Sequence, residues 1–325
     1  HNSILKMNKI LGLLLIFSAL QSLAQYPSTE ISNDELNVKI YLPDAEKGFY
    51  RGTRFDWSGV IPSLQYRGHE YFGEWYDKHD PERHDAITGP VEAFDPIDYD
   101  QAKPGELFLK IGVGTLKKLN NGPYRFNSPF EIQNGGTWSV KQKKDRVIFI
   151  HKLNDMGYNY VYKKTVRLTK GKPELVLEHS LKNIGQKSIN TRVFNHNFFV
   201  IDKQPTGPDF IISLPFKIQN QATGKRLINF EDNKMLYLKE LKKGDSTMEY
   251  PTGYSGDKVD DYDFRVENRK TGAGVRITSD RALAHFMYWS VATTLSPEPF
   301  TKVEAVPGKS FSWKVVYNFY ETTKN

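Results

Sequence analysis

The sequence predicts an all-β protein, built as one large two-sheet antiparallel sandwich. Three features carry this prediction: short apolar runs that alternate at period two, an aromatic content of 13%, and turn signals between the runs. No segment repeats its apolar residues convincingly at helical spacing, so the sequence predicts no amphipathic helices.

The predicted strands are clearest in the middle of the chain. The runs with the length and composition of strands lie at residues 147–150, 158–162 and 175–177. Gly, Pro and Asn favour turns where they cluster, at residues 120–123, 134–136, 169–173, 183–185 and 307–309. Neighbouring turn signals are often about 10 to 15 residues apart, which is typical of hairpins in a sandwich.

Two stretches interrupt the strand pattern, at residues 76–101 and 242–263. The first is dense in His, Asp and Pro, and a long polar loop inside a compact domain is functional more often than not. Neither an internal repeat nor a low-complexity linker divides the chain. We therefore predict that residues 25–325 form a single domain, which is long enough to bury a large core.

The N-terminal residues 1–24 have the pattern of an export signal. Lys6 and Lys9 precede an apolar run at residues 10–20, and Ser22 and Ala24 are the small residues that a signal peptidase requires. We expect cleavage near Ala24 and a periplasmic or secreted protein. The apolar run is too short to span a bilayer, and no later stretch is long and apolar enough to do so.

Composition excludes several classes of function. The chain has no cysteine, which rules out disulfides, thiolate metal sites and a cysteine nucleophile. The net charge is +7, but the basic residues are scattered and no nucleic-acid-binding motif accompanies them, so we expect no nucleic-acid partner. A mild preference for anionic ligands stays open.

A set of motifs, in preserved order, resembles the aldose 1-epimerase (galactose mutarotase) family. Two predicted strands at residues 158–181 are followed by Asn195-His196-Asn197-Phe198-Phe199, similar to the family's Asn-His-x-(Tyr/Phe)-Phe. The other matching segments are residues 51–55, 59–64, 284–289, Glu298-Pro299, 307–309 and 312–320. This resemblance implies a galactose mutarotase-like β-supersandwich whose concave sheet carries the site.

The resemblance also implies a reaction and its two catalytic residues. Interconversion of sugar anomers needs a base for the anomeric hydroxyl and an acid for the ring oxygen, and it needs no metal or organic cofactor. By resemblance His196 is the acid and Glu298 the base. The family's Leu-His-Gly-Gly segment has no counterpart, since residues 100–138 contain no His, and residues 85–92 replace its Gly-Arg-x-x-Asn-Arg-Ile segment.

Each of these residues also has a structural interpretation. The structural interpretation of His196 is a histidine at a strand end whose ring nitrogens hydrogen-bond to protein groups. Asn195 and Asn197 favour a functional role, because they can fix its tautomer or bind sugar hydroxyls. Glu298, between two prolines, would be an exposed loop residue. Arg54, placed on an early strand, either binds sugar or forms a salt bridge. Trp289 either packs in the core or stacks on a sugar.

His79, Arg83 and His84 lie in the acidic loop that replaces the family's missing segments. Three interpretations are open: a solvated surface loop, a sugar-binding loop, or a loop that coordinates a divalent metal. The spacing matches no defined metal motif, so we predict sugar contacts and no metal site.

The sequence therefore favours an exported aldose 1-epimerase-like enzyme that acts on a monosaccharide or on the reducing end of an oligosaccharide. A carbohydrate-binding module without catalysis is one alternative, favoured by the missing second histidine. A glycosidase or lyase of polysaccharide degradation, built on the same sandwich, is another.

Overall fold

The computed structural model describes residues 25–223 and 226–324, and they are folded almost entirely into antiparallel strands. The predicted export signal at residues 1–24 lies outside the described part. Two short 3-10 turns are the helical elements described, η1 (Ile201–Lys203) and η2 (Val259–Asp261). Within the described ranges, no helix has the length and hydropathy of a membrane span.

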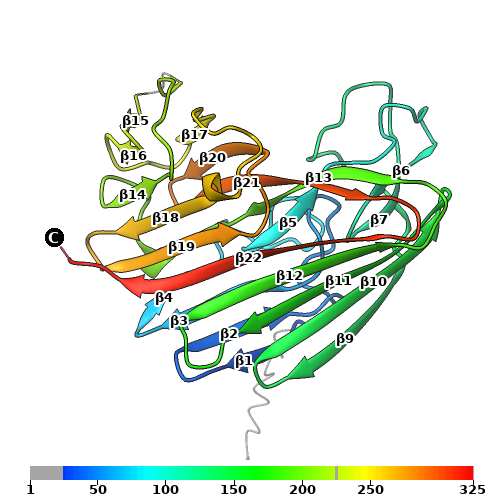
Figure 1. Cartoon of the computed structure of the whole chain (residues 1–325), viewed down its shortest axis with the longest axis horizontal. Helices are drawn as coiled ribbons and strands as arrows, with labels where there is room; N and C mark the ends of the chain where they lie inside the picture. The colour runs from blue at the N-terminus through cyan, green and yellow to red at the C-terminus, as the bar shows by residue number, and fades with distance from the viewer. Residues whose placement is uncertain (1–24, 224–225, 325) are drawn as a thin grey trace, which may run out of the picture.

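The largest sheet has ten strands and forms one layer of the molecule (Figure 1). Its order is β15 (Ile228–Glu231), β16 (Lys234–Tyr237), β14 (Phe210–Ser213), β18 (Asp263–Asn268), β19 (Ala273–Ser279), β22 (Ser310–Glu321), β12 (Glu174–Asn183), β11 (Tyr158–Leu168), β10 (Arg146–Asp155) and β9 (Thr137–Lys143). The three strongest predicted strands lie here, as β10, β11 and β12. Their apolar side chains point into the core because successive side chains alternate between the two faces.

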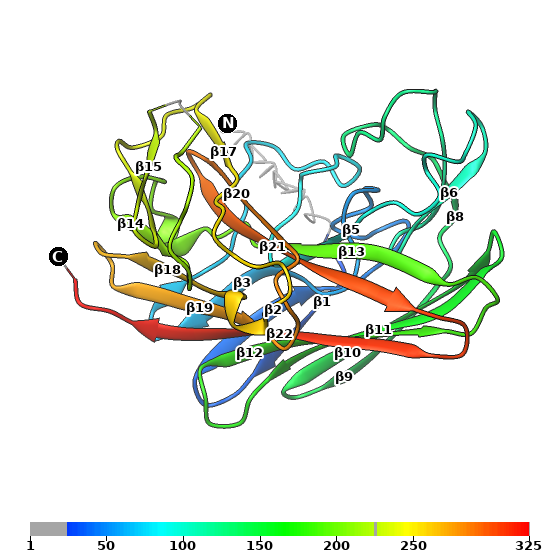
Figure 2. The same ribbon diagram turned by 45° about the horizontal axis from the view of Figure 1, so that its top comes forward.

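A five-stranded sheet packs against the ten-stranded one (Figure 2). Its order is β17 (Ser246–Glu249), β20 (His285–Val291), β21 (Thr294–Ala305), β13 (Ile189–His196) and β5 (Val91–Phe94). One face, with Val193, Phe286 and Val303, joins the main core between the sheets. The other face packs beneath the loops at residues 49–57 and 75–76, forming a second cluster.

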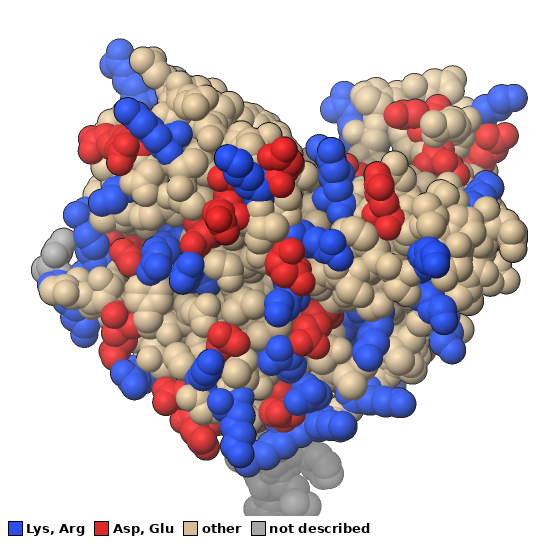
Figure 3. All heavy atoms as spheres, in the orientation of Figure 1, with Lys and Arg blue, Asp and Glu red and all other residues tan. Residues whose placement is uncertain are grey.

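Two smaller sheets complete the fold. The first contains β1 (Ser28–Ser32), β2 (Leu36–Tyr41), β3 (Val60–Tyr66) and β4 (His69–Glu70), and the second contains β6 (Leu107–Lys110), β7 (Gly114–Lys117) and β8 (Ile132–Asn134). Lys and Arg are interspersed with Asp and Glu over the face drawn in Figure 3. This mixture agrees with the scattered charges of the sequence.

Three sequence-based placements were wrong. The stretch at residues 76–101, expected to be irregular, contains strand β5, whose four residues are all buried. Arg54 lies in a bend before β3, and not on a strand. Glu298 lies inside β21 with 1% of its surface exposed, and not in an exposed loop. The flanking prolines misled the prediction, because proline is uncommon inside a sheet.

Candidate functional site

Strands β13 and β21 bring His196 and Glu298 together. The two strands pair antiparallel, with Val193 opposite Thr301 and Phe194 opposite Phe300. Two residues further along the same register, His196 faces Glu298. Residues directly opposite in an antiparallel pair lie on the same face with their side chains adjacent.

The two side chains are in contact and almost fully covered. His196 Nε2 lies 3.0 Å from Glu298 Oε1, and the exposed fractions are 2% and 1%. The other ring nitrogen, His196 Nδ1, has no hydrogen-bond partner among the described residues. Burial lowers the pKa of His196 below its usual 6.5, although Glu298 acts to raise it.

Aromatic side chains surround the His196 ring. Phe198 stacks on it with ring centroids 3.5 Å apart and planes inclined by 9°. Trp289 and Phe55 meet it edge-on, at centroid distances of 5.3 and 5.6 Å. Trp289, for which the sequence left core packing and sugar stacking open, lies beside the His196–Glu298 pair and is only partly buried. These rings form an aromatic wall that excludes water from the pair, and Trp289, which unlike Phe55 and Phe198 has exposed surface, can stack on the apolar face of a sugar.

Arg54 stands next to this aromatic wall. Its guanidinium lies 4.7 Å from the ring centre of Phe55 and 3.9 Å from that of Phe126. Burial lowers the pKa of Arg54, and the charge of Glu298 is the largest influence that opposes this shift. Arg54 is therefore close enough to the pair to affect its electrostatics.

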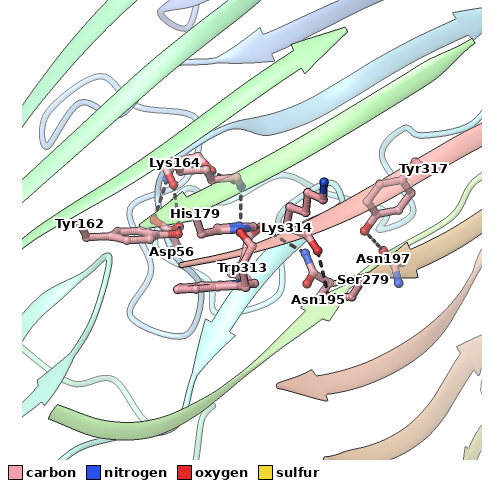
Figure 4. A network of polar contacts seen from close by, with 12 residues as sticks. Asp56, Tyr162, Lys164, His179, Asn195, Asn197, Ser279, Trp313, Lys314 and Tyr317 are labelled. Atoms are coloured by element: carbon pink, nitrogen blue, oxygen red, sulfur yellow. Dashed lines mark hydrogen bonds and ion pairs between the residues drawn. The ribbon is translucent and has the colours of Figure 1, made fainter. Parts of the chain in front are cut away.

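Asn195 and Asn197 are buried and point into the space between the two large sheets (Figure 4). Asn195 Nδ2 donates to Glu92 Oε1 over 3.1 Å. Asn197 Nδ2 donates to the Pro297 carbonyl over 2.7 Å, and its Oδ1 accepts from the Tyr317 hydroxyl. Both amides therefore form hydrogen bonds inside the protein, on the face of β13 opposite His196, because successive side chains alternate between the two faces of a strand. We therefore leave them out of the proposed sugar contacts.

A buried charge network lies behind strand β13 (Figure 4). Lys164 Nζ of β11 donates to Glu92 Oε2 of β5 and, over 2.8 Å, to the Ser58 carbonyl. His179 Nε2 lies 2.8 Å from Glu92 Oε1. Burial acts to raise the pKa of Glu92, but Lys164 and His179 outweigh it and lower the pKa to about 2. The network links the two sheets directly beneath the strand that carries His196.

The acidic loop contributes less to the pair than the sequence suggested. His79 is held by protein groups, with Nε2 2.8 Å from the Phe49 carbonyl and Nδ1 3.0 Å from the Tyr76 hydroxyl. Arg83 Nε lies 2.8 Å from Asp85 Oδ1. Arg83 and His84 line a neighbouring cleft, whose lining does not include His196. Among the described residues, no three His, Asp or Glu side chains gather in a way that could hold a metal ion.

The sequence did not single out Glu92 or Lys164. Both occur in segments where a charged residue is expected to be exposed, and only the pairing of β5 with β13 brings Glu92 opposite Asn195. One pattern in the sequence did indicate that Glu92 is buried. Its neighbours Val91, Ala93 and Phe94 are all apolar, which is typical of a buried strand.

Solved structures share this architecture. No protein-family model matches the sequence, and no curated protein matches it. An aldose epimerase homologue from C. elegans aligns over 92% of this chain and 100% of its own, with 14% identity and a TM-score of 0.56. The chain has a galactose mutarotase-like fold.

Two further structures give the same result for the fold. A galactose mutarotase related enzyme from Lactobacillus acidophilus covers 91% of this chain and 98% of its own, at 15% identity and a TM-score of 0.56. A galactose mutarotase-like protein from Lactobacillus casei aligns over 90% of this chain and 100% of its own, at 13% identity and a TM-score of 0.53. The predicted β-supersandwich is thus confirmed.

Proposed function

We propose that the protein is an aldose 1-epimerase-like enzyme that opens and recloses a sugar ring. The contact between His196 and Glu298, 3.0 Å apart on adjacent strands, is the observation that carries the proposal. Once the covering side chains move, an acid and a base on adjacent strands reach the two oxygens bonded to one carbon, which are the atoms at which the two proton transfers of this reaction occur.

The proposed mechanism uses both side chains. Glu298 takes the proton of the anomeric hydroxyl, His196 delivers a proton to the ring oxygen, and the bond between the ring oxygen and the anomeric carbon breaks to leave an aldehyde. Rotation of the aldehyde and reclosure, with the two roles reversed, give the other anomer. Arg54 and Trp289 are the groups we propose for holding the sugar, through its hydroxyls and its apolar face respectively.

Access to the pair requires side-chain movement, since so little of either residue is exposed. Phe126 is 46% exposed, and it stacks on the Arg54 guanidinium at the side of the aromatic wall. We propose that these two side chains move when the sugar binds. The predicted export signal would direct this activity to the periplasm or the exterior, where polysaccharide breakdown releases single anomers.

The test is anomer exchange followed by NMR on neutral, uronic and sulfated sugars. We expect His196→Gln and Glu298→Gln each to reduce exchange by about 10²- to 10⁴-fold. Matched controls on the same sheet are His285→Gln on β20 and Glu304→Gln, an exposed carboxylate on β21, which should exchange sugar at the wild-type rate. Exchange that survives both site substitutions would show that the assigned residues are wrong.

A carbohydrate-binding protein without catalysis is the second candidate. The covering of His196 and Glu298 favours it, because in this conformation neither group can reach a sugar. Sugars that bind, while none of them exchanges faster than in buffer, would establish this alternative.

A further inference from the structure

A second feature of the molecule, a cleft of about 870 Å³, lies beside the proposed site. Its walls come from segments far apart in the sequence: the bend at residues 51–57, the acidic loop, the loop between β7 and β8, and the start of β9. Trp57 and Trp138 supply aromatic surface, and Asn127 and Glu131 supply exposed polar groups.

The residues that line the cleft adjoin Arg54 in the chain, and Arg54 neighbours the His196–Glu298 pair. Gly52 and Thr53 line it, and the next residue is Arg54, whose guanidinium lies between Phe55 and Phe126. Phe126 in turn has its ring 5.7 Å from that of His84, which also lines the cleft. Once Arg54 and Phe126 move as proposed above, a ligand at the pair extends past these two side chains toward the cleft.

The chemistry of the walls suits a sugar chain. Aromatic faces stack on the apolar faces of sugar rings, while carboxylates, amides and guanidinium groups bind hydroxyls. Two covered donors, Trp138 Nε1 and Arg51 Nε, have no hydrogen-bond partner among the described residues, although buried polar groups usually have one. Both belong to residues that line the cleft.

The charge and the volume of the cleft further restrict the class of ligand that fits it. The ionisable lining residues are Arg51, Arg83 and His84 against Asp80, Glu82 and Glu131. Burial lowers the pKa of His84, so the cleft offers an anionic chain no excess of positive charge. Pockets of about 300 to 1,000 Å³ typically enclose ligands larger than one sugar ring. A single monosaccharide at the His196–Glu298 pair would leave the cleft unfilled.

We propose that the cleft binds the additional sugar units of a neutral oligosaccharide whose reducing end lies at His196 and Glu298. This inference rests on the proposed function, and it selects an oligosaccharide over a free monosaccharide as the substrate. The unit next to the reducing end stacks on Phe126, and the following unit lies between Trp57 and Trp138.

The experiment compares exchange and binding within matched sugar series: glucose, cellobiose and cellotriose; glucose, maltose and maltotriose; xylose, xylobiose and xylotriose. Exchange is measured by NMR as kcat/KM, and binding is measured by calorimetry. In the best series, kcat/KM for the oligosaccharide should exceed that for its monosaccharide by about tenfold or more, the effect of one additional well-used subsite.

Ser128→Trp is the decisive variant. Ser128 lines the cleft and its hydroxyl makes no described hydrogen bond, so an indole there obstructs the cleft without removing a contact. It should reduce the ratio of oligosaccharide to monosaccharide kcat/KM to near one. Asn121→Trp, exposed in the same loop and outside the cleft lining, should leave the ratio unchanged. Should Ser128→Trp fail to fold, the exposed pair Asn127→Ala and Glu131→Ala tests the same surface.

The outcomes separate the cleft from the reaction. Equal kcat/KM within every series, or a ratio that Ser128→Trp leaves unchanged, would overturn the cleft assignment and leave the proposed function intact. Oligosaccharide binding that Ser128→Trp abolishes, without exchange of any sugar, would support the cleft and overturn the epimerase proposal. Neither binding nor exchange would overturn both.

Discussion

The substitution Lys164→Met tests the buried charge network beneath strand β13. Both side chains of the Lys164–Glu92 ion pair are fully covered, and methionine fills a similar volume, so the main effect is to leave the Glu92 charge poorly compensated. Removing one partner of a buried pair costs about 3 to 5 kcal/mol. Lys164 is the largest of the influences that lower the pKa of Glu92, which has the sign that this loss requires.

The assay is denaturant unfolding at pH 7.5, followed by tryptophan fluorescence. Lys163→Met, on the exposed face of the same strand, is the matched control and should change the unfolding free energy by less than about 0.5 kcal/mol. Adding Glu92→Gln to Lys164→Met should recover part of the loss, because the uncompensated charge is then gone. A loss below about 1 kcal/mol for Lys164→Met, or strict additivity of the two substitutions, would refute this reasoning.

The deficit of Lys164→Met should also depend on pH. In the wild type, the lowered pKa of Glu92 adds stability that is complete above pH 4.5 and is lost as the pH falls toward 2. Without Lys164, only His179 of the two groups that lower the pKa of Glu92 still opposes the effect of burial, so this pKa rises and the carboxyl takes up a proton at a higher pH than in the wild type. The difference between variant and wild type should therefore shrink between pH 7.5 and pH 5.

Three further predictions concern the site and its supports. Burial lowers the pKa of His196 below 6.5. Above that pKa the protonated form of His196 is lost, so kcat/KM for exchange should fall about tenfold per pH unit. A flat profile from pH 5 to 8 would contradict the acid role. Burial lowers the pKa of His151 to about 4, so wild-type stability should fall by up to about 3 kcal/mol between pH 6.5 and 4; His151→Gln should flatten this slope in denaturant unfolding. Gly89→Ala would put a Cβ 2.1 Å from the Asn197 carbonyl oxygen. This clash should cost about 1 to 3 kcal/mol of stability and slow exchange. The control is Gly73→Ala, whose Cβ would have no neighbour nearer than 3.8 Å, and it should change neither stability nor exchange.

The sandwich could be predicted because its strands satisfy local rules. Strands β10, β11 and β12 show alternation and turn chemistry that need no knowledge of the rest of the fold. Strand β5 could not be predicted in the same way, since it is only four residues long and carries Glu92. Glu92 can be buried because Lys164 of β11 and His179 of β12 compensate its charge. Both partners lie far from β5 in the sequence.

The candidate site could be predicted only in part, and for a comparable reason. The sequence singled out His196, Glu298 and Trp289, and pairing of β13, β20 and β21 puts these residues side by side. The side to which Asn195 and Asn197 point depends on the face that His196 takes, so their proximity in sequence was misleading. The cleft is formed by four separate segments, and no local pattern could have revealed it.

The alternation along β13 has a consequence for how this protein tolerates change. Consecutive positions serve opposite purposes: Asn195 and Asn197 anchor the strand to the interior, while His196 faces Glu298. A single-residue insertion or deletion within the strand would exchange the two sets, burying the imidazole against Glu92 and turning the amides outward. A point substitution near the pair changes one side chain at a time. A change in the length of β13 would instead disrupt the Asn195 and Asn197 hydrogen bonds and the His196–Glu298 contact together.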